Sequence, residues 1–276
     1  MAPRHEKRPI VPDDRQELDC YNGMAMRNVL RWVFWLALIA VILPISAGAV
    51  LAYSHGWAAS WRTANWSSSG LLPLAQNTPE AHVIVLAART GNWKSIFAEH
   101  MSIIVKPAGA SEWTRYDVVG WGDPVRRNAY PADAFWYGNT PYIVRDIAGG
   151  EAEALIPLIE ETIARYPYSG QGTYRVWPGP NSNSFVAWVV RNTPGFAVEL
   201  PPAAIGKDFI SPGAGIAAAA SRTGFVVSLW GVAGMTLALR EGLEIHLFGS
   251  VIGVDPEDLA IKLPSLGKLS LTGLIG

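Results

Sequence analysis

The residue types that carry catalysis or metal binding are scarce in this chain. Its 276 residues include a single cysteine, Cys20, and five histidines that do not combine with cysteine or acidic residues at metal-ligand spacing. A disulfide framework and a cysteine-rich zinc site are therefore excluded, and we expect neither a metal nor a cofactor. The Gly-x-Ser-x-Gly elbow of α/β-hydrolases does not occur in the sequence. Gly213-Ala-Gly215 lacks the third glycine of a dinucleotide-binding loop, so it does not predict a phosphate site.

Two polar segments have residue types that could bind a ligand. Lys207 and Asp208 follow a pair of prolines and fit either a turn ion pair or the lining of a ligand cleft. Asp133, Trp136 and Tyr137 could stack on a sugar or a peptide. Aromatic side chains in strand-rich domains more often belong to the core, so both interpretations stay open.

The composition limits the class of protein that must position these residues. Half of the residues are hydrophobic, 16% are charged, and the mean hydropathy is +0.17. Soluble chains carry about 25% charged residues, and disordered chains are far less hydrophobic than this one. The net charge is −1 and the basic residues are scattered, so we expect no nucleic-acid partner. The apolar excess indicates a membrane segment, an unusually apolar domain, or both.

Residues 33–52 form an apolar run of twenty residues without a charge. About 20 helical residues cross the ~30 Å hydrocarbon core of a bilayer, so the run predicts a transmembrane helix in contact with lipid. Arg27 and Arg31 flank its N-terminal side, whereas the nearest lysine or arginine on the other side is Arg62. The positive-inside rule then places the N-terminus in the cytoplasm of a bacterial inner membrane and the rest of the chain in the periplasm.

A cleaved secretory signal is the alternative interpretation of the same run. Ala47-Gly48-Ala49 is an acceptable cleavage site, but the preceding polar region is long for a signal unless translation starts at Met24 or Met26. Both interpretations place the chain beyond Trp57 outside the cytoplasm. We predict a cytoplasmic disordered tail over 1–26, a transmembrane anchor over 27–53, a juxtamembrane connector over 54–80 and a periplasmic domain over 81–276.

The body of the chain consists of short apolar runs separated by Gly and Pro, a pattern typical of strands. We predict strands over 82–88, 101–106, 115–121 and 142–147, and a helix over 151–166 that Pro167 ends. A proline-rich loop then leads into a short helix over 184–190, which Asn181 or Ser182 could cap.

The last third of the chain predicts antiparallel strands. The apolar run over 224–239 is too short to span a membrane, and Gly231 and Gly234 break it where a hairpin would turn. Further strands are expected over 243–248, where apolar and polar residues alternate, and over 259–263. The fold class is therefore α+β: one N-terminal transmembrane helix and a strand-rich antiparallel domain with a few helices.

Several segments resemble a known bacterial family, domain of unknown function 3750, over approximately residues 80–270. The resemblance implies a bacterial envelope context but no activity. The segments that carry it are His100-Met-Ser-Ile-Ile-Val-Lys-Pro-Ala, Tyr116-Asp-Val-Val-Gly-Trp-Gly, Trp177-Pro-Gly-Pro-Asn-Ser-Asn-Ser-Phe, Leu200-Pro-Pro-Ala-Ala-Ile-Gly-Lys-Asp-Phe and Ala260-Ile-Lys-Leu-Pro.

The chain also distantly resembles circularly permuted papain-like folds of the NlpC/P60 type. Those folds place a histidine at the start of a strand and a nucleophilic cysteine later, in an Asn-Cys-x-x-Phe pattern that opens a helix. Here His100 precedes a predicted strand, and Asn181-Ser182-Asn183-Ser184-Phe185 opens a predicted helix. Ser182 stands where the cysteine would be. The resemblance therefore implies a permuted papain-like arrangement in which Ser182 replaces the thiol.

A serine at that position needs more help than a cysteine. A helix N-terminus can stabilise a thiolate, but it cannot ionise a hydroxyl, so Ser182 would need His100 as a general base. The third group that orients the imidazole could be Tyr116, Asp117 or Asp123. Helix N–H groups and the side chains of the asparagines on either side of Ser182 could form the oxyanion hole. The simpler alternatives are that Ser182 caps the helix and that His100 is a hydrogen-bonded residue at a strand end.

These observations predict a membrane-anchored bacterial envelope protein that binds cell-envelope material through its periplasmic domain. The alternative is an envelope amidase or esterase of the permuted papain-like type, with Ser182, His100 and Asp117 as its catalytic residues. A third hypothesis makes the Trp-rich segment 57–66 a docking surface for a protein partner. The residues expected to contact a substrate are Asn181, Asn183, Tyr116, Trp177, Lys207 and Asp208.

Overall fold

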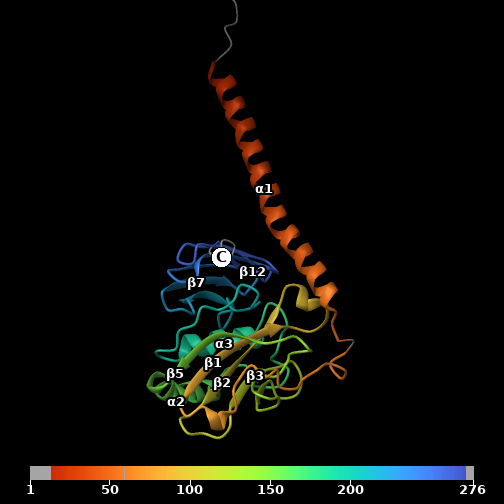
Figure 1. The fold of residues 1–276 in the computed structure, drawn as a ribbon. Coiled ribbons are helices and arrows are strands. Elements are labelled where there is room, and N and C mark those ends of the chain that lie inside the picture. The colour runs from red at the N-terminus through yellow and green to blue at the C-terminus, as the bar shows by residue number, and fades with distance from the viewer. Residues whose placement is uncertain (1–13, 59, 272–276) are drawn as a thin grey trace, which may run out of the picture. The chain divides into compact units, whose positions relative to one another are not determined.

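The computed structural model describes residues 14–58 and 60–271 (Figure 1). The chain divides into two compact units, residues 1–42 and 43–276. Helix α1 (Asp14–His55) crosses the boundary between them. The strands and the other helices all belong to the second unit.

Helix α1 contains the apolar run that the sequence singles out. Its part from Met26 to His55 is 30 residues long, with a mean hydropathy that reaches 2.4, and is long and apolar enough to cross a membrane. The helix begins at Asp14, so residues 14–26 are helical and not part of a disordered tail as predicted. Their glutamate, leucine, methionine and arginine residues favour helix, and the apolar run nucleates it. The remainder of the predicted tail, residues 1–13, lies outside the described residues.

The first sheet has five antiparallel strands in the order β4-β3-β2-β1-β5. They are β1 (His82–Arg89), β2 (Glu99–Lys106), β3 (Thr114–Val118), β4 (Val125–Arg127) and β5 (Tyr142–Ala148). The four predicted strands are confirmed, but β3 ends at Val118 instead of continuing to Trp121. The N–H of Val119 donates to the carbonyl of Pro124 at 2.9 Å, which turns the chain back into the short β4.

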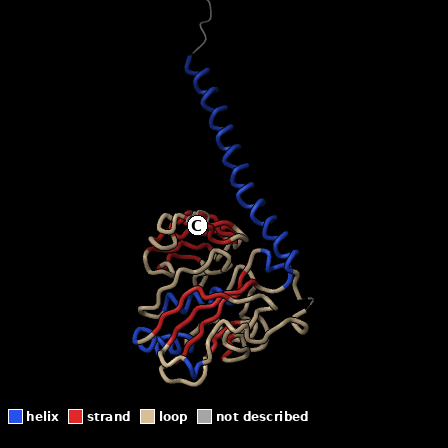
Figure 2. The backbone as a smooth tube through the Cα atoms, in the orientation of Figure 1, coloured by secondary structure: helices blue, strands red, loops and turns tan. Residues whose placement is uncertain are grey.

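Helices α2 (Gly150–Ala164) and α3 (Ser182–Asn192) pack on one face of this sheet and form its apolar core (Figures 1 and 2). Helix α3 begins two residues earlier than predicted. Asn181 is its N-cap, because the side chain accepts the N–H groups of Asn183 and Ser184, and the Ser184 hydroxyl accepts the N–H of Asn181 in return. The capping role left open between Asn181 and Ser182 therefore belongs to Asn181.

The predicted connector is part of the folded domain. The Asp133 carboxylate accepts hydrogen bonds from the Ser68 hydroxyl at 2.7 Å and from the Leu72 N–H at 3.2 Å. Trp66 stacks on Tyr130 and packs edge-on against Trp136. Asp133, which is buried, thus fastens the segment before β1 onto the domain instead of facing a ligand.

The second sheet is a seven-stranded antiparallel meander (Figures 1 and 2). The predicted hairpin and the two later strands are confirmed, with Gly231 in the hairpin turn and Gly234 inside a strand. Three of its strands, the first, fifth and last, are not predicted by the sequence pattern. The strands are β6 (Ala214–Ala218), β7 (Gly224–Leu229), β8 (Ala233–Ala238), β9 (Gly242–Leu247), β10 (Ser250–Asp255), β11 (Ala260–Leu263) and β12 (Gly267–Ser270).

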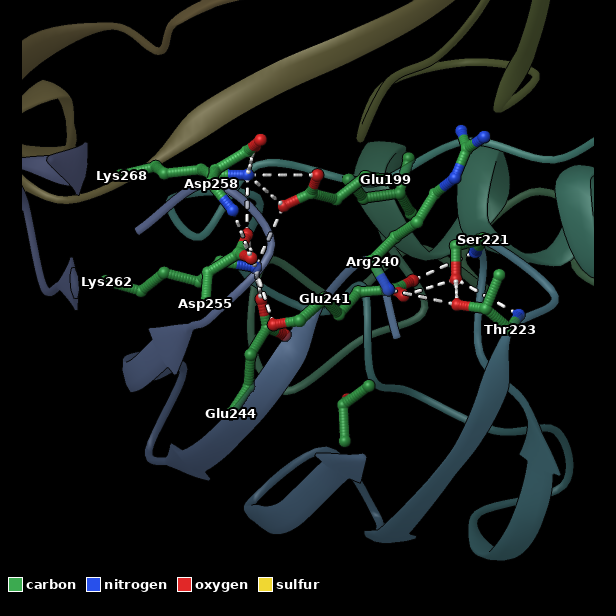
Figure 3. Close-up of polar contacts among 12 residues, drawn as sticks. Glu199, Ser221, Thr223, Arg240, Glu241, Glu244, Asp255, Asp258, Lys262 and Lys268 are labelled. Atoms are coloured by element: carbon green, nitrogen blue, oxygen red, sulfur yellow. Dashed lines mark hydrogen bonds and ion pairs between the residues drawn. The ribbon is translucent and has the colours of Figure 1, made fainter. Parts of the chain in front are cut away.

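The seven-stranded sheet buries its polar face. Buried and exposed side chains alternate along β9. Glu244 and His246 are buried, whereas Leu243, Ile245 and Leu247 are 38%, 39% and 48% exposed. The buried side is an ion-pair network, drawn in Figure 3. This is the reverse of the usual arrangement, in which the apolar face of a sheet covers the core.

Lysines hold the buried carboxylates of this network together. Lys262 donates to Glu244 and to Glu199, both at 2.9 Å, and Lys207 lies 2.8 Å from Glu244 (Figure 3 shows the first two). Burial by itself raises the pKa of Glu244, but the two ammonium groups outweigh it and lower that pKa to about 2. Lys268 lies among the carboxylates of Glu199, Asp255 and Asp258, so its ammonium group offsets part of the negative charge of this acidic cluster.

Candidate functional site

A histidine, an aspartate and an arginine form a buried hydrogen-bonded triad at one end of the five-stranded sheet. His100 is the second residue of β2. Arg115 and Asp117 lie two residues apart on β3, so the alternation of side chains along the strand puts these two on the same face of the sheet. The pairing of Ile103 with Tyr116 brings His100 onto the same face, diagonally across from Asp117. His100 Nε2 lies 2.8 Å from Asp117 Oδ1, and Arg115 Nε donates to Asp117 Oδ2 at 2.7 Å.

The electrostatics of the triad fix the protonation of the imidazole. Burial raises the pKa of Asp117, but the Arg115 guanidinium and the His100 hydrogen bond outweigh it and hold that pKa far below its usual range. An ionised Asp117 only accepts hydrogen bonds, so the proton between the two side chains sits on His100 Nε2. Burial lowers the pKa of His100, and the Asp117 hydrogen bond only partly opposes this. His100 is therefore neutral at pH 7, and its Nδ1 is unprotonated.

Trp136 holds the imidazole in place from one side. The two rings are stacked with centroids 3.5 Å apart and an interplanar angle of 5°. Arg115 lies over the same indole, 5.8 Å from its centroid. Trp136 is buried, so the ring is a wall of the site and leaves no face for stacking on a sugar.

A cavity of about 940 Å³ opens where β2 begins and β3 ends. Its volume lies within the ~300–1,000 Å³ range of small-molecule sites. His100, Ser182, Asn181, Asn183 and Trp177 all line it. Five residues that the sequence analysis singled out, from segments about 80 positions apart, thus line one cavity. The rest of the lining is mainly aromatic and aliphatic, including Trp93, Phe97, Val119, Trp121, Trp136, Tyr174, Val176 and Phe248.

Ser182 is the first residue of α3 and is positioned by its neighbours. The Asn183 amide donates to the carbonyl of Glu99 at 2.9 Å, which ties the start of α3 to the strand position just before His100. In the described part of the chain, the Ser182 hydroxyl forms no hydrogen bond with His100 or with any other residue. The arrangement is that of a serine and a neutral imidazole facing one cavity without a direct contact.

The hydrogen bonds at the start of α3 correct the predicted oxyanion hole. The Asn181 amide donates to the carbonyls of Val176 and Ile205, and the Asn183 amide to those of Glu99 and Ile205, so neither side chain is free to stabilise an oxyanion. The Asn183 and Ser184 N–H groups are bonded to the cap. Within the described residues, the Ser182 N–H remains as the donor at this helix end.

Asn183 lines the cavity and has a buried acceptor that is without a partner among the described residues. Its side chain is 2% exposed, and its Oδ1 has no hydrogen-bond partner in the described part of the chain. A buried carbonyl oxygen without a partner is costly, and a ligand that donates a hydrogen bond would relieve that cost.

The other predicted contact residues lie away from the cavity. The Tyr116 hydroxyl donates to Glu160 at 2.7 Å, on the helix-covered side of the sheet. Lys207 pairs with Glu244 in the ion network, and Asp208 is buried under β7, where the Ser228 hydroxyl donates to it at 3.4 Å. Lys207 and Asp208 line only a small pocket of about 10 Å³, and Lys207 pairs with Glu244 on β9 instead of with Asp208. Of the three candidates for orienting His100, the geometry selects Asp117; Asp123 accepts from Gln171.

Two ionisable residues close to His100 were not among the predicted site residues. Arg115 could have been recognised, because the Arg-x-Asp spacing puts both charges on one strand face. Glu99, which lines the cavity beside His100, gave no such signal. Burial raises the pKa of Glu99, although Arg89 and a 2.9 Å hydrogen bond from Tyr142 oppose the shift.

The five-stranded sheet, its two helices and this cavity define an α+β domain with a histidine-centred pocket. Residues 80–209 match the family model described as "Protein of unknown function (DUF3750)", the family that the sequence motifs resemble. No curated protein and no solved structure matches the chain. The resemblance to permuted papain-like folds therefore stays a prediction.

Proposed function

We propose that this protein binds the apolar part of a cell-envelope molecule in the cavity beside His100. The observation that carries the proposal is the lining: a cavity of about 940 Å³ whose walls are largely tryptophan, phenylalanine and valine side chains, with a smaller set of polar groups that includes His100, Ser182 and Asn183. Ligand sites typically combine such apolar walls with a few convergent polar groups. An amphipathic molecule with an acyl chain fits this division, because the chain would fill the aromatic part of the cavity.

The polar lining residues supply both a donor and acceptors for a head group. His100 Nδ1 is an unprotonated acceptor at pH 7, and Asn183 Oδ1 is a buried acceptor without a partner. The Ser182 hydroxyl can serve as either donor or acceptor. A head group with hydroxyl or amide protons would satisfy these atoms.

The membrane anchor brings the cavity to such molecules. Part of α1 is long and apolar enough to span a bilayer, and arginines flank its N-terminal side. We place the protein in a bacterial inner membrane with a single span, its N-terminus in the cytoplasm and the cavity in the periplasm. The bilayer is then both the anchor point and the source of ligand.

Photocrosslinking of the full chain in nanodiscs tests the proposal. The nanodiscs would contain phosphatidylglycerol with a diazirine on one acyl chain, and the crosslinked peptides would be mapped by mass spectrometry. We expect adducts on peptides that line the cavity, such as those with Trp121 or Trp177. Ile205→Trp, which fills the cavity, should remove these adducts, and Ile210→Trp, outside the lining, should keep them. Adducts confined to α1 in all three proteins would contradict the proposal.

A second candidate function is acyl transfer, with Ser182 as nucleophile. It is favoured by one observation: Ser182 lies at a helix N-terminus and lines the same cavity as a neutral imidazole whose other nitrogen is held by an ionised aspartate. His100 Nδ1 would take the hydroxyl proton as Oγ attacks the carbonyl carbon of an ester or amide. The Ser182 N–H would then stabilise the oxyanion, and His100 would return the proton to the leaving group.

Fluorophosphonate labelling separates binding from acyl transfer. If Ser182 is a nucleophile, the full chain should be labelled and Ser182→Ala should not, whereas Ser250→Ala, a change of another serine in the same cavity, should label normally. Unlabelled wild type would end the acyl-transfer candidate. It would leave the binding proposal intact, because that proposal needs no nucleophile.

A further inference from the structure

The outward face of the seven-stranded sheet is apolar from edge to edge. Every outward position in its strands is free of charge, and Ser250 is the one polar residue among them. The strand register joins the side chains into rows. One row crosses all seven strands, and its members from Phe225 onward are 37–49% exposed: Ala218, Phe225, Leu237, Leu243, Val254, Ile261 and Leu269.

A second row lies beside the first and makes the apolar surface continuous. It runs through Ile216, Val227, Met235, Ile245 and Ile252 in register. Seven strands at ~4.8 Å spacing make this face about 30 Å wide. Large contiguous apolar surfaces on folded domains mark sites of interaction with a partner or a membrane.

The hairpin tips extend the apolar surface beyond the strands. Trp230 and Phe248, at one end of the sheet, are 59% and 73% exposed. Leu239 and Leu259, at the opposite end, are 77% and 57% exposed. Exposed tryptophan, phenylalanine and leucine side chains are typical of surfaces that enter the interface of a bilayer.

Ion pairs on the buried face allow the seven-stranded sheet to turn its charged side chains inward and its apolar side chains outward. The charged side chains of the strands point inward, where Glu244, Lys262 and Lys268 find partners among themselves and on the chain beneath. The sheet thus removes its charges from the outward face at the cost of burying ion pairs. Because the outward face carries no charges, no charged group would have to be desolvated when it contacts hydrocarbon, and transfer of its apolar area out of water is favourable.

We infer that the outward face of the seven-stranded sheet docks onto the lipid bilayer. The inference rests on the proposed anchoring by α1. Ten residues separate the end of α1 at His55 from Trp66, which is packed on the domain. They reach at most about 35 Å, so an anchored domain cannot leave the membrane surface. A bilayer is therefore always within reach of the domain, whereas a second copy of the chain must be met by diffusion.

The docked sheet also connects the bilayer to the cavity. Phe248, at the tip of the β9–β10 hairpin, lines the cavity and lies near Trp177, with ring centroids 6.4 Å apart. The apolar surface therefore continues from the sheet face to the cavity wall. An acyl chain could pass from the bilayer along Phe248 without crossing water.

Spin labelling of the full chain in vesicles of phosphatidylethanolamine and phosphatidylglycerol tests the docking. In a Cys20→Ser background, nitroxides would be attached at Ile245→Cys on the sheet face, Leu38→Cys in α1 and Glu161→Cys on α2. Glu161 is 63% exposed and serves as the water-facing control. Collision rates with oxygen and with a water-soluble nickel complex report immersion in lipid. We expect the oxygen-to-nickel ratio to be severalfold higher at positions 38 and 245 than at position 161.

The same labels distinguish the ways in which the inference can fail. A high ratio at position 38 together with a control-like ratio at position 245 would overturn the docking and leave the anchor standing. A control-like ratio at position 38 would overturn the anchor and, with it, the docking. Shielding of position 245 from both reagents, with a short label-to-label distance by dipolar spectroscopy, would assign the face to a second copy instead. Leu237→Cys provides a second label on the sheet face.

Discussion

The two sheets of this protein use the same strand alternation with opposite polarity. In the five-stranded sheet, the side chains of β1 and β2 are almost all buried, and α2 and α3 cover an apolar face. In the seven-stranded sheet, charged side chains face inward and aliphatic ones face outward. An alternating pattern therefore identifies a strand, but which of its faces is buried depends on what the sheet packs against.

The two buried ionic clusters also differ, in whether they border a cavity. The His100–Asp117–Arg115 triad borders a large cavity, whereas the cluster around Glu244 is closed over by lysines. Perturbed ionisable groups beside a cavity are candidates for function, and closed ion-pair networks are structural. The family match also separates the two regions, because residues 80–209 include the triad and end before β6.

Breaking the closed cluster should give the largest effect on stability. Glu244→Gln leaves Lys207 and Lys262 buried without their shared carboxylate, which should cost about 3–5 kcal/mol of unfolding free energy. Leu243→Gln, the neighbouring outward residue, should cost less than about 1 kcal/mol. Denaturant titrations followed by tryptophan fluorescence would measure both. Equal losses would mean that the two faces of β9 do not differ as described.

Aliphatic truncation should show the reverse order between the two sheets. Ile103→Ala, in the core of the five-stranded sheet, should cost about 2–5 kcal/mol, because it leaves a cavity under α3. Ile245→Ala, on the outward face of the second sheet, removes the same atoms from an exposed position and should cost less than about 1 kcal/mol. The same titrations apply. A cost at Ile245 that matches Ile103 would show that another part of the protein covers this face in solution.

Acid should destabilise the closed cluster over a defined range of pH. The pKa of Glu244 is about 2 in the folded protein, against an ordinary value of 4.5. The ionised carboxylate therefore contributes its full share of the unfolding free energy above pH 4.5, and this share is lost as the pH falls toward 2. The loss is on the order of 3 kcal/mol. Unfolding free energies measured from pH 7 to pH 3 should fall, and the fall should be shallower in Glu244→Gln. Parallel curves for the two proteins would contradict the assignment.

The sequence predicted most of the first sheet because local signals there agree with the packing. Apolar runs gave its four longer strands, and the cap signal at Asn181 gave the start of α3 to within two residues. The short strand β4 was missed, because three residues carry no periodicity. In the second sheet, β6, β10 and β12 were missed, since glycine, serine and lysine interrupt their apolar pattern.

The site was predicted in part, for reasons that the geometry explains. Resemblance to a known arrangement brought His100 and Ser182 together, and the cavity contains both. Lys207 and Asp208 were expected either as a turn ion pair or at a ligand cleft, but Lys207 points inward and pairs with Glu244 on the second sheet. The local sequence around Lys207 does not show that the sheet buries its charged face. The burial depends on ion pairs with residues far along the chain: Glu244 is 37 residues and Lys262 is 55 residues after Lys207.

Alkylation of a cysteine at position 182 tests the central claim, that the cavity accepts an apolar chain. In a Cys20→Ser background, Ser182→Cys would react with iodoacetamide and with an N-dodecyl iodoacetamide, and the rate ratio would be normalised to Glu161→Cys. We predict a preference for the long-chain reagent of at least about tenfold, since two buried methylene groups at ~0.8 kcal/mol each would suffice. Ile205→Trp should remove the preference and Ile210→Trp should retain it. A normalised ratio near unity in the unblocked protein would contradict the account.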